Sequence, residues 1–140
     1  MTSNFEKYNE ELEDIKVKFT GYWIYINSRQ KPNYEITGKY LFFYDEIDRL
    51  IEIAKNEIRN HSFHVAKVNS SILGSNTDHV LCLYFKDDSR KYELADRSKF
   101  EYQNVKYRYW KSDIDTIRGK YSPEFLGKLS NADKKRFTKN

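Results

Sequence analysis

The sequence contains few of the residues that form disulfides, metal sites, tight turns and phosphate-binding loops. Its 140 residues include one cysteine, two prolines and five glycines. The single cysteine, Cys82, excludes an internal disulfide, and three scattered histidines lack metal-ligand spacing. No glycine stands in a P-loop or GxGxxG arrangement, and no serine stands in a nucleophile elbow. We therefore predict no metal site and no cofactor, and we expect Cys82 to be a small buried apolar residue.

Long apolar runs and a globally basic surface are also absent. No stretch approaches the roughly 18 apolar residues that span a bilayer. The acidic N-terminus, MTSNFEKYNEELEDIK, has no apolar signal core, so we predict a cytoplasmic protein without membrane association. The net charge of +4 lies in residues 119–140, which hold six cations and two acids, whereas the rest holds 19 of each. A neutral body argues against a surface that coats nucleic acid.

Aromatic residues are abundant: the chain has 12 tyrosines and nine phenylalanines, enough for a packed core. Hydrophobic periodicity predicts helices over residues 5–19, 46–60 and 90–100, and a short one over 123–129. It predicts strands over 21–26, 38–44, 61–69, 79–86 and 105–110. We therefore expect an N-terminal helical extension (1–20), one α+β domain (21–129) and a basic disordered tail (130–140).

Residues 106–121, KYRYWKSDIDTIRGKY, change abruptly from a strand pattern to a polar loop. By period two, Val105, Tyr107 and Tyr109 share one face. The other face then carries Lys106, Arg108 and Trp110. The acids, cations and hydroxyls that follow are typical of either a polar ligand site or a solvated turn.

The same stretch carries a family resemblance. Residues 109–121 read YWKSDxxTxxGxY, and other landmarks precede it in order: YWI (22–24), TGKYLFF (37–43), Asp48 and Ile51, AKV (66–68) and LCLYxxD (81–87). Across residues 21–122 the chain resembles the basophilic-leukaemia-expressed protein family, whose bacterial members are labelled as phosphothreonine lyase domains. The family's usual TGKW motif has Tyr40 in place of tryptophan here.

This family is similar in fold to translation initiation factor 4E, the mRNA cap-binding protein. The resemblance implies an α+β fold with a curved, mainly antiparallel sheet of about five to six strands, and two to three helices on one face. It does not fix a function, because one fold hosts many functions. The Lys-, Asn-, Ile- and Tyr-rich composition is compatible with a bacterial or phage origin.

The best candidate site is a set of cations from separate strands: Lys39, Lys67 and Lys111, joined by Arg118 from the closing loop. Lysine among strand aromatics is costly to bury unless an anion or a carboxylate partners it. Phosphate is the expected anion. The alternative is that each lysine reaches solvent or pairs with a nearby aspartate. The remaining candidate ligand-binding residues are Trp23, Tyr109, Trp110, Asp113 and Thr116.

Three functions are compatible with the sequence. The first is a binding module for a phosphate-containing small molecule, RNA or phosphopeptide. The second is a phosphothreonine-lyase-like enzyme with Lys67 or Lys111 as base and His64 as acid. However, His64 and Lys67 are three residues apart, so an unbulged strand directs them to opposite faces. The third is an interaction module with a protein partner, from a phage or a bacterial defence or counter-defence system.

Overall fold

The computed structural model describes residues 7–72 and 77–113. Within these residues there are seven strands and two helices. The strands are β1 (Glu10–Glu11), β2 (Ile15–Phe19), β3 (Trp23–Ser28), β4 (Gly38–Tyr44), β5 (Val65–Asn69), β6 (His79–Phe85) and β7 (Lys106–Ser112). The helices are α1 (Ile47–Asn60) and α2 (Lys91–Phe100). The predicted closing helix and basic tail lie outside the described residues.

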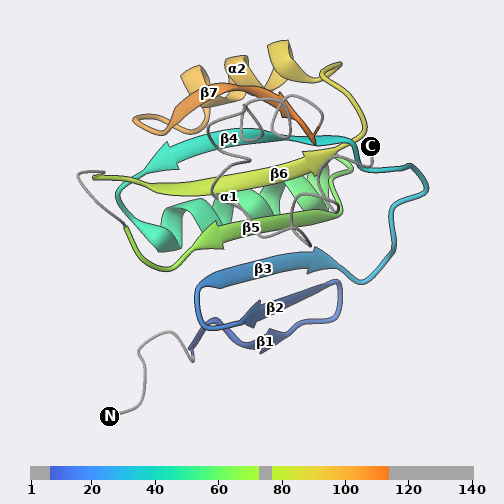
Figure 1. Cartoon of the computed structure of the whole chain (residues 1–140), viewed down its shortest axis with the longest axis vertical. Helices are drawn as coiled ribbons and strands as arrows, with labels where there is room; N and C mark the ends of the chain where they lie inside the picture. The colour runs from blue at the N-terminus through green and yellow to red at the C-terminus, as the bar shows by residue number, and fades with distance from the viewer. Residues whose placement is uncertain (1–6, 73–76, 114–140) are drawn as a thin grey trace, which may run out of the picture.

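The strands form one curved, open sheet in the order β1-β2-β3-β5-β6-β4-β7. Every paired neighbour in it is antiparallel. Figure 1 shows α1 behind the middle of this sheet and α2 at its β7 end. The predicted α+β class and curved antiparallel sheet are confirmed. The predicted number of five or six strands is too low, because the described residues alone form seven strands of the sheet.

The N-terminal helix predicted over residues 5–19 is wrong, because the described part of this segment forms β1 and β2. Its apolar spacing fits a helix, but Ile15, Val17 and Phe19 also alternate with lysines, as in a strand. Pairing with β3 decides between the two patterns: β2 lies antiparallel to it over all five residues, from Ile15 opposite Ser28 to Phe19 opposite Ile24. The segment is therefore part of the sheet.

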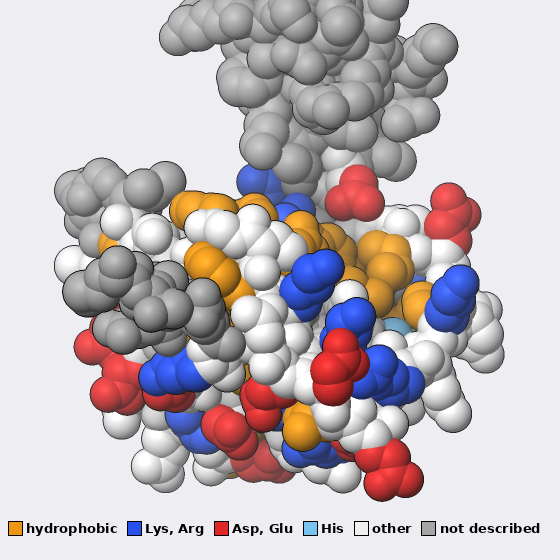
Figure 2. Space-filling model, turned by 90° about the horizontal axis from the view of Figure 1, so that it is seen from below, with side chains coloured by type: hydrophobic (Ala, Val, Ile, Leu, Met, Phe, Trp, Pro, Cys, Tyr) orange, Lys and Arg blue, Asp and Glu red, His pale blue; other side chains and the backbone are white. Residues whose placement is uncertain are grey.

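Burial in the core stabilises the β1–β2 hairpin more than its ion pairs with α1 do. Figure 2 shows acidic and basic side chains interspersed on this side of the molecule. Three ion pairs join the N-terminal segment to α1: Lys55–Glu10, Arg59–Asp14 and Lys7–Asp48. The Arg59–Asp14 and Lys7–Asp48 pairs are exposed, and such pairs contribute about 0–1 kcal/mol each. The side chains of Ile15 and Val17 are almost fully buried, and each contributes about 1.5–3 kcal/mol.

Helix α1 covers the sheet with the apolar face that its spacing predicts. Leu50, Ile51, Ala54 and Ile58 are buried, and α1 contacts β3, β4, β5 and β6. The helix begins and ends within one residue of the predicted range. Strand β5 begins four residues later than predicted, because Ser62 has φ 62°, a left-handed conformation that does not continue a strand.

Strand pairing separates the residues of the sheet into two faces. The face toward α1 is apolar: Ile26, Ala66, Leu83 and Tyr40 lie side by side across four strands, and all are fully buried. Their strand neighbours point the other way, because side chains alternate along a strand. We call this second side the lysine face. It carries Lys39, Lys67 and Lys111, with Trp23, Tyr25, Phe43, Cys82, Tyr84, Lys106 and Arg108.

Candidate ligand-binding face

The predicted lysines from three strands lie on the same face. Lys67 of β5 is paired with Cys82 of β6, and Lys39 of β4 is paired with both Tyr84 and Lys111. Residues paired across antiparallel strands point to the same side of the sheet. The lysine face therefore has ammonium groups on β4, β5 and β7, with β6 between two of them.

Lys111 reaches this face because β7 is irregular. Trp110 is paired with Tyr40, whereas Tyr107 is paired with Phe42, so β7 has one more residue than β4 between these pairs. Beyond such a bulge, each side chain points to the face of the sheet opposite to the one that regular alternation would give it. Lys111 therefore points to the same side as Lys106, although five residues separate them and a regular strand would place them on opposite faces.

Aromatic rings lie among the lysines. The Lys67 ammonium is 3.9 Å from the Trp23 ring centroid, which is within cation–π distance. The Nζ atoms of Lys67 and Lys39 both lie 5.8 Å from the centroid of the Tyr84 ring. Tyr84 thus lies near two of the three cations, and a ring at this place offers a flat surface beside the positive charge.

The pKa of the Cys82 thiol reflects the nearby lysines. Burial raises the pKa of the Cys82 thiol, while the positive charges of Lys39, Lys67 and Lys111 lower it by less. All three ammonium groups therefore act on one sulfur atom. The Cys82 side chain is 3% exposed, as expected for a small packed residue, and the raised pKa keeps it a neutral thiol.

Asp113 is the carboxylate that the described residues place near this cluster. Among the described residues, no carboxylate forms an ion pair with Lys39 or Lys111. Asp113 lies close enough to help raise the pKa of the Tyr84 hydroxyl, although burial is the largest cause of that shift. Asp113, a predicted site residue, is thus near the cluster. Thr116 and Arg118 lie outside the described residues, as does the Tyr109 side chain.

The two tryptophans do not share a face. Trp23 lies beside Lys67, whereas the Trp110 ring packs against buried Tyr40 at a centroid distance of 4.8 Å. The bulge again explains this, because it turns Trp110 toward the side that α1 covers. A sandwich of a base between these two rings is therefore excluded, and of the two only Trp23 belongs to the lysine face.

His64 also lies apart from the lysines. Its Nδ1 atom is 3.1 Å from the Tyr34 hydroxyl, and Tyr34 in turn packs against Phe85 on the covered side. Burial, and then the positive charge of Arg90, lower the pKa of His64. Strand β5 has no bulge between Ala66 and Val68, so Lys67 points away from the covered side. The proposed acid and base are not brought together.

A second cationic group lies on the lysine face at the other end of β7. Lys106 is paired with Phe43, and the Arg108 guanidinium carbon is 5.4 Å from the Phe43 ring centroid. These residues line a recess of about 330 Å³ with Asn69, Thr77, Asp78 and Val80. The sequence pattern placed Lys106 and Arg108 on one face but gave no reason to include them in the site.

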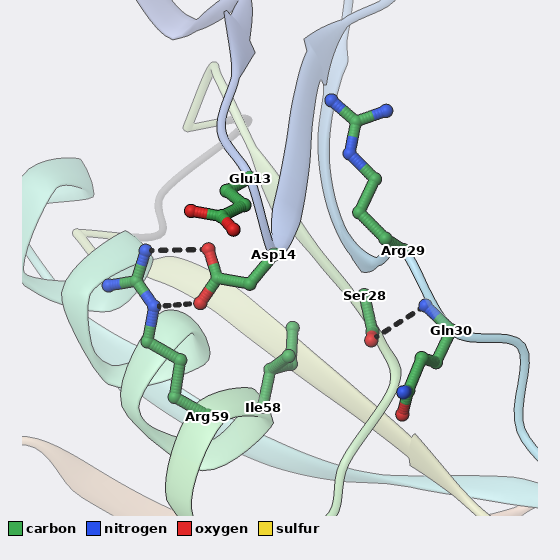
Figure 3. Close-up of a pocket in the computed structure, with 7 residues that line it drawn as sticks. All are labelled: Glu13, Asp14, Ser28, Arg29, Gln30, Ile58 and Arg59. Atoms are coloured by element: carbon green, nitrogen blue, oxygen red, sulfur yellow. Dashed lines mark hydrogen bonds and ion pairs between the residues drawn. The ribbon is translucent and has the colours of Figure 1, made fainter.

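A larger cavity, about 850 Å³, lies elsewhere in the described residues and is less suited to an anion. It lies between the turn after β1, the end of β3 and the end of α1 (Figure 3). The Arg59 guanidinium already binds Asp14 there, with Nε 2.7 Å from Oδ2, and this bond lowers the pKa of Asp14. Arg29, directed away from that pair, binds Glu11.

No family model, curated protein or solved structure matches this chain, so the family resemblance and its fold relationship remain predictions. Within the described residues, neither helix is long and apolar enough to cross a membrane. The same residues contain no group of three or more His, Cys, Asp or Glu side chains placed to hold a metal ion.

Proposed function

We propose that this protein is a binding module for a phosphate-bearing ligand, held on the lysine face by Lys39, Lys67 and Lys111. The observation that carries the proposal is that Lys39, Lys67 and Lys111 lie on one face of the sheet near Cys82, two of them beside the Tyr84 ring. Like charges in close proximity repel one another, and the phosphate of a bound ligand would offset this repulsion.

The neighbouring groups suit the rest of such a ligand. Phosphate oxygens accept charge-assisted hydrogen bonds from ammonium groups. The rings of Trp23, Tyr25 and Tyr84 offer flat surfaces for a base or another planar group. Asp113 supplies an acceptor for a hydroxyl or amino group of the ligand. Nucleotides, RNA ends and phosphopeptides all share this chemistry.

The geometry supports the lyase alternative less well, because it requires an acid near the base. His64 lies on the side of Tyr34 and Phe85, and Lys67 lies on the opposite face. A lyase on this face would need a different acid.

The test is a titration by calorimetry with a nucleoside monophosphate, a phosphothreonine peptide and inorganic phosphate. Lys39→Gln and Lys111→Gln should each weaken binding about tenfold, equivalent to about 1.4 kcal/mol. Lys99→Gln, an exposed lysine on α2, is the matched control and should bind normally. Equal losses in the control, or full binding by both site variants, would contradict the proposal. Dehydration of the phosphothreonine peptide, detected by mass spectrometry, would instead favour the lyase.

A further inference from the structure

We infer that the ligand is a single-stranded nucleic acid whose backbone runs along β4 and β7, from Lys39 and Lys111 to Lys106 and Arg108. This inference rests on the proposed function and narrows its ligand class. The observation behind it is the second cationic group, Lys106 and Arg108. The proposed phosphate site at the three clustered lysines does not use this group.

The two cationic groups are too far apart for one phosphate. On β4, Lys39 lies beside Lys111 and Phe43 lies beside Lys106, so four residues separate the two ends. At about 3.3 Å per residue, this distance is roughly 13 Å. A ligand that contacts both ends must therefore carry at least two anionic groups, as a chain of phosphates does.

The surface between and beside these groups suits unpaired bases. Tyr84 and Trp23 lie next to the lysines at one end, and Phe43 lies under the Arg108 guanidinium at the other. Aromatic rings and guanidinium planes stack with bases of any sequence, which is the usual mode of single-strand binding. Phosphopeptides lack such a repeating arrangement of planar groups and phosphates, so they explain the second group less well.

A duplex fits this face poorly. The seven-stranded sheet is roughly 29 Å wide, since neighbouring strands lie about 4.8 Å apart. The major groove is only about 12 Å wide, so it admits a helix or a two-stranded ribbon but not this face. A duplex also keeps its bases stacked and away from the rings. We therefore expect a preference for single strands.

The experiment measures binding of labelled single-stranded RNA and DNA of about eight nucleotides, within the usual site size of such domains. Anisotropy is recorded over a range of salt concentrations, with the full chain. Lys106→Gln/Arg108→Gln should weaken binding at least tenfold. It should also reduce the slope of log K against log salt by about 1.4, since each single-strand phosphate contact contributes about 0.7.

Three comparisons make the result decisive. Lys91→Gln/Lys99→Gln removes two charges from α2 and should leave both affinity and slope unchanged. The Lys106/Arg108 variant should bind a nucleoside monophosphate as the unmodified chain does, because that ligand uses only the first group. A duplex of the same length should bind more weakly.

The outcomes separate the two proposals. Unchanged single-strand binding by the Lys106/Arg108 variant, or equal affinity for the duplex, would overturn the inference. Tight binding of the phosphopeptide with no oligonucleotide binding would overturn it too, yet leave the proposed function intact. If no phosphate-bearing ligand binds the folded chain, both proposals fail. Circular dichroism of each variant confirms folding.

Discussion

At the residue scale, the most demanding position is Glu57, a carboxylate with no solvent exposure. Arg97 of α2 donates to both of its oxygens, at 2.6 and 2.8 Å, and the Tyr102 hydroxyl donates as well. Burying a charge is costly unless partners replace its water. This network therefore fixes α1 and α2 relative to each other, and with them the strand β7 that follows α2.

Removing Arg97 should be strongly destabilising. Arg97→Ala leaves the Glu57 carboxylate buried without its cation, and breaking such a pair costs about 3–5 kcal/mol. Urea unfolding followed by circular dichroism measures the loss. Lys99→Ala on the same helix is the control and should change stability by less than about 0.5 kcal/mol. A loss below about 1 kcal/mol in Arg97→Ala would mean that solvent reaches Glu57 readily.

His64 should make folding stability depend on pH. Burial and the charge of Arg90 lower its pKa in the folded chain, whereas the unfolded chain has the ordinary value of about 6.5. As pH falls through 6.5, about the unfolded value, the unfolded chain gains a proton that the folded chain does not, so stability falls. An NMR titration should place the His64 midpoint below this value. A midpoint at or above it would contradict the burial of the ring.

At the scale of elements, sequence periodicity predicted most of the fold and failed where two patterns compete. Strand β4 and helix α1 each satisfy a single pattern, and their predicted bounds agree with the structure to within one residue. Residues 7–19 satisfy both a helical and an alternating pattern. Only pairing with β3, a contact with another part of the chain, decides for strands. Local sequence does not contain that information.

The bulge in β7 is the second feature that periodicity could not supply. Strict alternation places Lys106, Arg108 and Trp110 on one face, whereas the extra residue moves Trp110 to the covered side and brings Lys111 to the lysine face. The predicted site residues Lys39, Lys67 and Lys111 lie on one face of the sheet. Trp23 and Trp110, both predicted as ligand-binding residues, lie on opposite faces. Bulges depend on pairing between strands, so alternation alone misassigns residues beyond them.

Gly38 should be required for this arrangement. A Cβ atom there would lie 2.5 Å from Trp110 Cζ2, 2.7 Å from the Lys111 carbonyl oxygen and 2.8 Å from Ser112 Cα. Gly38→Ala should therefore push β7 from β4, lower stability by about 1–3 kcal/mol and weaken ligand binding through Lys111. Unfolding and calorimetry measure both effects. Adding Trp110→Leu relieves only the side-chain clash, so full recovery in the double variant would contradict this explanation.

At the scale of the whole molecule, the proposed function assigns stability to one face of the sheet and binding to the other. The covered face holds the fully buried apolar residues, and α1 packs on it. The lysine face holds the clustered cations of an otherwise nearly neutral body. If this division holds, substitutions that abolish binding need not destabilise the fold. Repulsion among the lysines even predicts that removing one of them makes the fold slightly more stable.

Lys111→Gln should therefore leave the fold equally or slightly more stable while it weakens binding. Removing one of three clustered cations lessens repulsion, and we expect a gain of up to about 0.5 kcal/mol at low salt. At about 1 M salt, where the Debye length falls to about 3 Å, the gain should shrink. Urea unfolding of both proteins at the two salt concentrations measures it, with Lys99→Gln as control. A loss above about 1 kcal/mol would mean that Lys111 serves the fold through a carboxylate partner, and its place in the binding site would then lose its main support.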